Sequence, residues 1–430
     1  MKTLYTGGYV VTMDDAGTEH EDGWLLESDG VIEAVGAGEP PEADTRSELN
    51  GALVTPGFVN THHHLYQSLT RARAQEADLF TWLRELYPIW ARLDAESEYA
   101  AAKYGLAELM TSGCTTVFDH HYVFPRGVDG LIEAEMQAAG ELGVRLVPSR
   151  GSMDLGESDG GLPPDSLVEE PDAILADTER LAAKYPELVV APCSPFSVTG
   201  NLMRESAELA RRLGLQLHTH LAETVEEEEY CRELYGCGPV EYLGELGWLE
   251  GNVWCAHCVH LNDDDIGAFA AGGVGIAHCP TSNLRLGAGI ARVRELLDAN
   301  VRVGLGVDGS ASNERGDLSL EVKEALLLAR ARGGPGALTA REALRLGTRG
   351  GAEVLGRDDI GSLEPGKSAD FAIWGDDWIF SGADDPVAAL VFGGPCTVSG
   401  LVVAGRPVLA NVVEDEIVRE HRKAAARFAS

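Results

Sequence analysis

The sequence predicts an α/β protein: a (β/α)8 TIM-type barrel with a small β-sandwich domain formed from both chain termini. Eight short apolar runs with helix-like stretches between most of them predict the barrel. Strand-like runs near both ends, broken at the beginning by Asp-Gly turns, predict the sandwich. We expect residues 1–54 and 360–430 to form the sandwich domain with a C-terminal helix, and residues 55–359 to form the barrel.

The expected barrel strands, in order, cover residues 53–59, 115–118, 145–148, 188–191, 215–217, 253–256, 274–277 and 301–307. Apolar residues at helical spacing predict helices over residues 99–110, 131–142, 173–185, 202–213, 264–271 and 293–299. The terminal strands are expected over residues 4–13, 24–35, 370–374, 398–403 and 408–413, and a closing helix over 414–428.

Histidines concentrate at the C-terminal ends of these strands, where such barrels carry their active sites. Of the 12 histidines in the chain, only His20 and His421 lie away from these ends. His62 and His64 follow the first strand two residues apart and therefore share one face, while His63 points elsewhere. Neutral imidazole is the commonest metal ligand among side chains, so this rim is predicted to hold a metal ion.

Composition limits the partners and the location of the protein. Its 69 acidic and 34 basic residues give a formal net charge of −35, which repels nucleic acid and anionic membrane surfaces. The first residues lack the apolar stretch of a signal peptide, so we expect a cytoplasmic protein, and we also expect a homo-oligomer. The charge suggests a host with a salt-rich cytoplasm; the alternative is an acidic protein of an ordinary mesophile.

Six segments, in order along the chain, resemble the amidohydrolase superfamily and in particular its purine-deaminase branch. They are residues 56–64 (Pro-Gly-Phe-Val-Asn-Thr-His-His-His), 217–223 (Leu-His-Thr-His-Leu-Ala-Glu), 256–258, 278–283, 306–309 (Gly-Val-Asp-Gly) and 361–370. The resemblance covers essentially the whole chain. It implies the barrel fold and metal-dependent hydrolysis of a small heterocyclic base.

The resemblance also implies one divalent metal ion, zinc or else iron, held by His62, His64, His220 and Asp308. His218 shares a face with His220, and we expect it to lie deeper in the barrel. Binuclear members of the superfamily carry a lysine at the end of the fourth strand, and residues 190–196 contain none. This argues for a single ion.

Three residues are given roles by the same resemblance. Glu223 is the expected proton shuttle, Asp308 is expected to take a proton from the attacking water, and His257 is expected to stabilise the tetrahedral intermediate by a hydrogen bond. The acidic run at 226–229 is expected to be a solvated loop.

The expected substrate contacts are Gln67, Arg150, His121 and Asn313. Gln67 stands three residues after His64, as in guanine deaminases, and its amide suits a base edge that carries donors and acceptors. The fourth strand lacks the arginine of those enzymes, so Arg150 is expected to contact a carbonyl oxygen instead. Trp82, Tyr122 and Phe196 are further pocket candidates, with ordinary core packing as the alternative.

Residues 119–122, 151–154 and 160–165 are more similar to 8-oxoguanine deaminases. The implied reaction converts 8-oxoguanine to urate and ammonia, with metal-bound hydroxide attacking the amino-bearing ring carbon. The alternatives are guanine, isoxanthopterin or a hydroxytriazine as substrate, or a catalytically inactive binding barrel.

Overall fold

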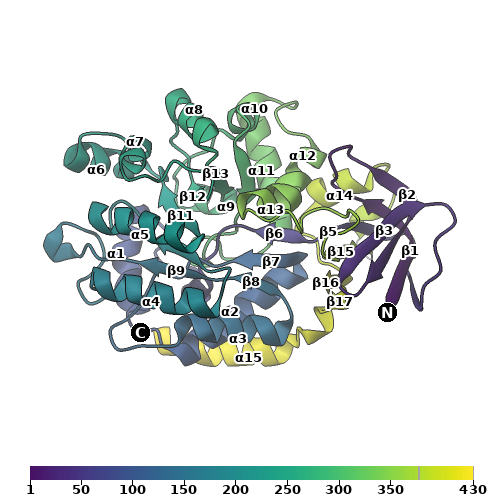
Figure 1. Cartoon of the computed structure of the whole chain (residues 1–430), viewed down its shortest axis with the longest axis horizontal. Helices are drawn as coiled ribbons and strands as arrows, with labels where there is room; N and C mark the ends of the chain where they lie inside the picture. Colours follow the sequence, from purple (N-terminus) through teal and green to yellow (C-terminus); the bar gives the residue numbers. More distant parts are fainter. Residues whose placement is uncertain (376–377, 430) are drawn as a thin grey trace.

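The computed structural model describes residues 1–375 and 378–429, which form a barrel with a second sheet at one side (Figure 1). The barrel sheet is entirely parallel. Its strands are β6 (Phe58–Asn60), β7 (Cys114–Phe118), β8 (Arg145–Val147), β9 (Ser149–Ser152), β10 (Val189–Pro192), β11 (Gln216–Leu221), β12 (Val253–His257), β13 (Gly275–His278) and β14 (Arg302–Leu305). The predicted barrel is therefore confirmed.

Nine segments give eight barrel strands because the third strand is interrupted. Pro148 separates β8, which pairs with β7, from β9, which pairs with β10. Proline has no N–H to donate to a strand neighbour, so it is expected at such a break. The last barrel strand in the sequence, β14, pairs with the first, β6, so the sheet closes on itself.

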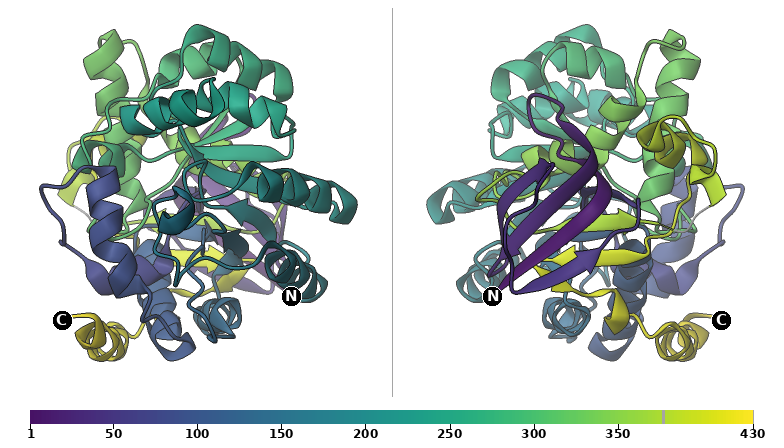
Figure 2. Two further views of the ribbon diagram at one scale, coloured as in Figure 1. Left: turned by 90° about the vertical axis from the view of Figure 1, so that its left-hand side faces the viewer. Right: turned by 90° about the vertical axis from the view of Figure 1, so that its right-hand side faces the viewer.

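Helices surround the barrel, and a large cluster of buried apolar side chains fills the space between the two layers (Figure 2). They are α1 (Leu79–Trp90), α2 (Ala95–Thr111), α3 (Leu131–Leu142), α4 (Pro171–Lys184), α5 (Gly200–Leu213), α6 (Val225–Tyr235), α7 (Pro239–Glu245), α8 (Asp263–Gly272), α9 (Pro280–Arg285), α10 (Val293–Asp298), α11 (Leu318–Gly333), α12 (Ala340–Arg345) and α13 (Gly351–Val354). Within the described residues, no helix has both the length and the apolar character needed to cross a bilayer.

The second sheet combines both ends of the chain, as predicted. It contains β1 (Lys2–Val11), β2 (Glu19–Ser28), β3 (Val31–Ala37), β4 (Thr45–Glu48), β5 (Leu53–Pro56), β15 (Phe371–Trp374), β16 (Gly400–Val403) and β17 (Arg406–Pro407). The strand order is β17-β16-β15-β5-β1-β2-β3, with β4 paired to β1. These strands enclose a small apolar core of their own, which includes Tyr5, Leu25 and Phe371.

The chain passes from the second sheet into the barrel at Gly57. The predicted first strand is therefore two strands: β5 pairs with β15 in the terminal sheet, and β6 pairs with β7 in the barrel. A Cβ atom on Gly57 would lie 2.2 Å from the side chain of Thr115, so only glycine fits this close passage. The domain boundaries expected at 54/55 and 359/360 stay a prediction.

The C-terminal region departs from the prediction in one place. Residues 408–413 do not form a strand; they include a short 3-10 turn, Leu409–Asn411, whose Asn411 amide donates to the carbonyl of Leu142 at the end of α3. Beyond α14 (Pro386–Gly393) and this turn, the predicted closing helix is present as α15 (Glu414–Ala425). It packs on α2 of the barrel layer (Figure 1).

Candidate active site

Four side chains meet at the C-terminal ends of three barrel strands. His62 and His64 follow β6, His220 lies in β11, and Asp308 follows β14. Asp308 Oδ1 lies 3.3 Å from Nε2 of His62 and 3.2 Å from Nε2 of His64. His64 Nε2 lies 3.1 Å from His220 Nε2. All four side chains are buried, so the structure brings together the whole predicted ligand set.

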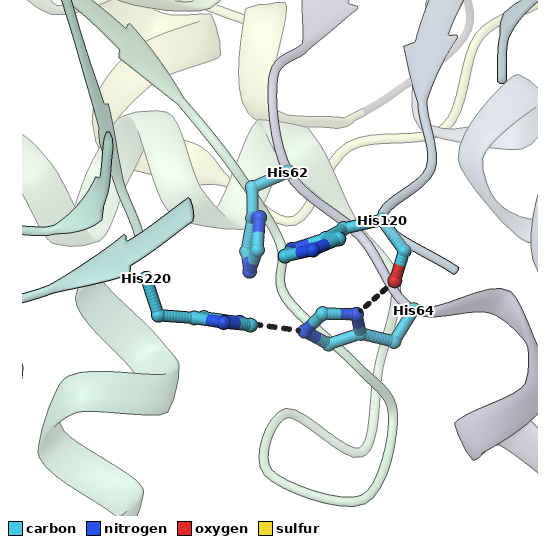
Figure 3. Close-up of side chains that lie close together, drawn as sticks. All are labelled: His62, His64, His120 and His220. Atoms are coloured by element: carbon cyan, nitrogen blue, oxygen red, sulfur yellow. Dashed lines mark hydrogen bonds between the residues drawn. The ribbon is translucent and has the colours of Figure 1, made fainter. Parts of the chain in front are cut away.

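Backbone carbonyls fix the orientation of two of these imidazoles (Figure 3). The Nδ1–H of His64 donates to the carbonyl oxygen of His120 at 2.7 Å. The Nδ1–H of His220 donates to the carbonyl oxygen of Cys193 at 2.7 Å. A carbonyl oxygen can only accept, so both rings carry their proton on Nδ1 and direct an Nε2 lone pair at the centre of the site.

A longer chain of hydrogen bonds fixes His62. His218 donates from Nδ1 to the carbonyl oxygen of Trp254 at 3.0 Å, which leaves its Nε2 as an acceptor. His62 Nδ1–H then donates to that nitrogen at 2.9 Å. The Nε2 of His62 is left with a lone pair and no hydrogen-bond partner. His218 therefore lies beneath the site and orients a ligand, in the deeper position expected for it.

The donor set fits a metal ion. The two Nε2 lone pairs of His64 and His220 face each other at 3.1 Å, an arrangement that is repulsive unless a cation lies between them. Burial lowers the pKa of His62 to about 3, so this imidazole is neutral at pH 7, as a ligand must be. Three imidazole nitrogens and one carboxylate are a typical catalytic set for zinc.

His120 is a fourth histidine in this group (Figure 3). Its Nε2 donates to the carbonyl of Ala191 at 2.9 Å, and its buried Nδ1 has no partner. Its ring stacks on that of His220, with centroids 4.8 Å apart. The sequence identified this histidine as a strand-end residue without giving it a role, and its free lone pair makes it available as a further ligand.

Asp308 is held in place by two hydroxyl groups and by its own backbone. Its Oδ2 accepts from Ser282 at 2.5 Å and from Ser312 at 3.1 Å. Its φ of 61° lies in the left-handed region, which is uncommon for a residue with a Cβ atom and concentrates at functional sites. These contacts leave Oδ1 facing the histidines.

Glu223 and His257 lie next to the ligand set, with Glu223 Oε2 3.6 Å from His257 Nε2. Burial and the neighbouring Asp308 raise the pKa of Glu223 well above its usual range. Its Oε1 has no hydrogen-bond partner. His257 is oriented by a 2.8 Å hydrogen bond from Nδ1 to the side-chain oxygen of Asn283. A buried carboxyl group that holds a proton near neutral pH is suited to act as a general acid.

Glu227 corrects the expectation that residues 226–229 form a solvated loop. Its side chain is fully buried, and its two carboxylate oxygens accept from the backbone N–H groups of Ala222 and Glu223 at 2.9 and 3.0 Å. It therefore fixes the backbone that carries Glu223. An acidic run at the start of a helix gave no sign of which member would turn inward.

A small cavity opens onto these residues. Its remaining walls are largely aromatic and aliphatic, and they include three candidates from the sequence, Trp82, Tyr122 and Phe196. Gln67 also lines it, with a buried Oε1 that has no hydrogen-bond partner. A Cβ atom on Gly309 would lie 1.9 Å from that oxygen, so a glycine is required beside the amide.

Three predicted substrate contacts do not line this cavity. Arg150 faces the helix layer, where its guanidinium binds Glu169 and Asp177 and lies over the ring of Phe124. Neighbouring residues of a strand alternate between faces, and on β9 it is Ser149 whose side chain contacts the end of β7, by accepting from the N–H of His121.

His121 and Asn313 are also turned away. His121 follows His120 directly and points to the opposite side, toward Glu135, with 2.7 Å between its Nδ1 and Oε1 of that residue. The amide of Asn313 donates to the carbonyl of Val307 and to Glu321, both at 2.8 Å, and so fixes the loop after β14. Each of the three side chains is held by partners outside the cavity, so a contact with substrate stays a prediction for them.

Comparisons with known proteins agree with this geometry. The sequence profile of the amidohydrolase family matches residues 53–408. The chain is 45% identical to the 8-oxoguanine deaminase of Pseudomonas aeruginosa, over 95% of each chain. It is 39% identical to an isoxanthopterin deaminase from an unknown prokaryotic organism, over 91% of this chain and 88% of that protein.

Solved structures agree as well. A triazine hydrolase variant superposes with a TM-score of 0.94 at 34% identity and covers both chains completely. The atrazine chlorohydrolase of Arthrobacter aurescens TC1, solved in complex with zinc, gives a TM-score of 0.93 at 34% identity over 99% of this chain and 100% of that one. The chain belongs to the amidohydrolase family.

Proposed function

We propose that this protein is a metal-dependent deaminase that hydrolyses 8-oxoguanine to urate and ammonia. The observation that carries the proposal is the position of a buried carboxyl group, Glu223, beside a converging His/Asp set at the end of a cavity with largely apolar walls. The similarity over 95% of the chain to an 8-oxoguanine deaminase supports this choice of base.

His62, His64, His220 and Asp308 would hold one divalent ion, which we propose to be zinc, with iron as the alternative. Bound there, the ion would lower the pKa of a water molecule to about 7. Although burial opposes the shift, contacts with His62 and His64 hold the pKa of Asp308 well below its usual range, and its Oδ1 faces the same point. Asp308 can therefore accept a proton from the attacking water.

Glu223 supplies the second proton transfer. Because burial raises the pKa of its carboxyl group and so favours the protonated form, Glu223 can protonate the ring nitrogen next to the carbon that water attacks. Asp308, which has taken the proton from the attacking water, can then pass that proton to the departing amine, which leaves as ammonia. His257 faces Glu223, and its Nε2, when that nitrogen carries a proton, can donate a hydrogen bond to the oxygen that adds to the ring.

Gln67 is the proposed contact to the edge of the base. Its amide offers both a donor and an acceptor, and its buried oxygen is free to accept from a ring N–H. Trp82, Tyr122 and Phe196 provide flat apolar walls for a planar heterocycle. Arg150 is not part of this proposal because its guanidinium is bound elsewhere.

Isoxanthopterin is the second candidate, since a relative of that name is 39% identical. A hydroxytriazine is the third, since a hydroxydechloroatrazine ethylaminohydrolase from a Pseudomonas species is 36% identical over 86% of this chain. Guanine is a fourth candidate base, and an inactive binding barrel is the competing hypothesis. In each catalysed case a ring carbon loses an amine to water.

Ammonia release from zinc-loaded protein, measured over 8-oxoguanine, guanine, isoxanthopterin and a hydroxytriazine, tests the proposal. We expect the highest kcat/KM with 8-oxoguanine and one urate formed per ammonia. A preference for another ring would overturn the substrate, and no release from any ring would favour the inactive barrel. The Glu223→Gln variant is the matched control. The cytoplasmic location and the homo-oligomeric state stay predictions, the latter to be checked by light scattering.

A further inference from the structure

A second group of buried titratable side chains lies on the other side of the end of β7. Glu98 comes from α2, Glu135 from α3, and Asp119 and His121 from the residues that follow β7. All four are fully buried, and none lines the cavity described above. The helices α2 and α3 pack side by side beneath β7 (Figure 1), so this group is enclosed between the barrel and its helix layer.

The carboxyl groups of this cluster have few partners other than one another. Both oxygens of Glu98, both oxygens of Glu135 and Oδ2 of Asp119 accept no hydrogen bond from an N–H or hydroxyl group of the described residues. Glu135 lies instead within hydrogen-bond reach of the carboxyl groups of Glu98 and Asp119. Among the described residues, the only potentially cationic side chain recorded within 4 Å of Glu98 or Glu135 is His121, and burial lowers the pKa of its imidazole, which disfavours the charged form. A buried carboxylate is costly unless a cation or several hydrogen bonds compensate for its charge.

His121 directs a free nitrogen into the acidic group. Its Nε2 donates to the carbonyl oxygen of Val123 at 2.9 Å, which fixes the proton on that nitrogen. The Nδ1 lies 2.7 Å from Oε1 of Glu135 and 3.9 Å from Oε1 of Glu98, yet it has no hydrogen-bond partner. An imidazole held in this way, with one nitrogen on a carbonyl and the other facing carboxylates, is typical of a metal ligand.

We propose that Glu98, His121 and Glu135 form a second metal site, which holds a structural divalent ion. One such ion would neutralise the two glutamates. Metal–ligand bonds of about 2.0–2.2 Å place the ligand atoms of one ion within about 4 Å of each other. The two distances from His121 Nδ1 to the glutamate oxygens lie within this limit. Asp119, whose Oδ2 likewise accepts no hydrogen bond from an N–H or hydroxyl group of the described residues, is available as a fourth ligand.

The ligand type distinguishes this site from the first. Two or three carboxylates and one imidazole favour manganese or iron(II) more strongly than the imidazole-rich set of His62, His64 and His220 does. All of its side chains are fully buried, so the ion would support the fold and would not meet substrate. It would join α2 and α3 to the end of β7.

The competing state is protonation, because burial raises the pKa values of Glu98 and Asp119 well above their usual range and that of Glu135 to about 8. Metal content decides between the two. The protein is saturated with Zn²⁺ or with Mn²⁺ and freed of excess ion by gel filtration. The number of bound ions per chain is then measured by elemental mass spectrometry. We expect two ions per chain with at least one of these metals, and one ion per chain with both would overturn the proposal.

Variants locate the second ion. Glu98→Gln and Glu135→Gln should each hold one ion, while the matched control Glu96→Gln, an exposed position on the same helix, should hold two. His220→Asn should lose the first ion and keep the second. Two ions in both glutamine variants would overturn the assignment.

A measurement on the unaltered protein covers the case in which these variants fail to fold. Zinc is bound first, Mn²⁺ is added, and the electron spin echo of the bound manganese is recorded. We expect modulation from a single imidazole nitrogen. Modulation from several imidazoles, or no bound manganese, would contradict a site made from His121 and carboxylates.

Discussion

The two buried groups on either side of the end of β7 differ in their ligand types and in their surroundings. In the first, each of three histidines has its Nδ1 held by a neighbour, and the group opens onto a cavity that contains Glu223. In the second, carboxylates outnumber the single histidine and helices close the space. Burial and convergence of ligands suit both groups to hold a metal ion, but only the first group also has the access and the proton donor that catalysis needs.

Replacing Glu223 by glutamine should separate catalysis from metal binding most clearly. The amide keeps the shape of the side chain but cannot transfer a proton, so kcat should fall by about 10²–10⁴-fold while the metal content stays unchanged. Steady-state kinetics and elemental analysis measure both quantities. The exposed neighbour in Glu226→Gln serves as the control. Wild-type turnover in Glu223→Gln would remove the functional difference between the two groups.

His421 is a buried histidine outside both groups, and it serves as a reference for the loss of stability at acid pH. Burial lowers its pKa from 6.5 to about 4, so the unfolded chain takes up a proton first as the pH falls. Its contribution to the free energy of unfolding is fully present above pH 6.5 and is lost between pH 6.5 and 4, by about 3 kcal/mol.

The His421→Phe variant should therefore lose less stability than the wild type over that pH range, in urea unfolding monitored by circular dichroism. The ring of residue 421 stacks on Tyr104 at 4.1 Å, so phenylalanine preserves the packing. If both proteins lose the same stability over this pH range, the acid sensitivity arises from groups other than His421.

His218→Phe tests whether the orientation of a ligand matters as much as its presence. The variant removes the acceptor for His62 Nδ1 and keeps a ring of similar size. We expect zinc affinity to fall by about 10–100-fold, as for other partners of metal-bound histidines, in a titration against a chelator of known affinity. His421→Phe is the control, and unchanged affinity in His218→Phe would show that the hydrogen-bond chain is dispensable.

Glu227→Gln should have the smallest effect. The variant replaces one of the two oxygens that accept from Ala222 and Glu223 by an amide group, which leaves one buried N–H without an acceptor. A cost of about 1–3 kcal/mol at the backbone of Glu223 should lower kcat by roughly tenfold with KM and metal content unchanged. A lower melting temperature with unchanged kcat would assign Glu227 a role in stability only.

Much of the fold followed from the sequence because its signals are local. Each of the eight apolar runs overlaps a barrel strand, and the helical periodicity between them was reliable. The boundary at Gly57 was missed because residues 53–59 are mostly apolar on both sides of it and two sheets share them; the Pro56-Gly57 pair is the local signal of the break. Residues 408–413 have the composition of a strand, yet contacts with the end of α3 hold part of them as a turn.

The sequence by itself determined which residues reach the catalytic rim. Spacing along a strand is local chemistry, so it grouped His62 with His64 and placed His220, His257 and Asp308 at neighbouring strand ends. The family resemblance then selected Glu223.

Only the tertiary structure decided which way the other rim residues point. Arg150 meets Glu169 and Asp177, and His121 meets Glu135. Glu227 turns inward to cap the backbone of Glu223. The physical reason is the same in each case. A buried polar side chain points toward its hydrogen-bond or ion-pair partner, and that partner can come from a different element of the fold.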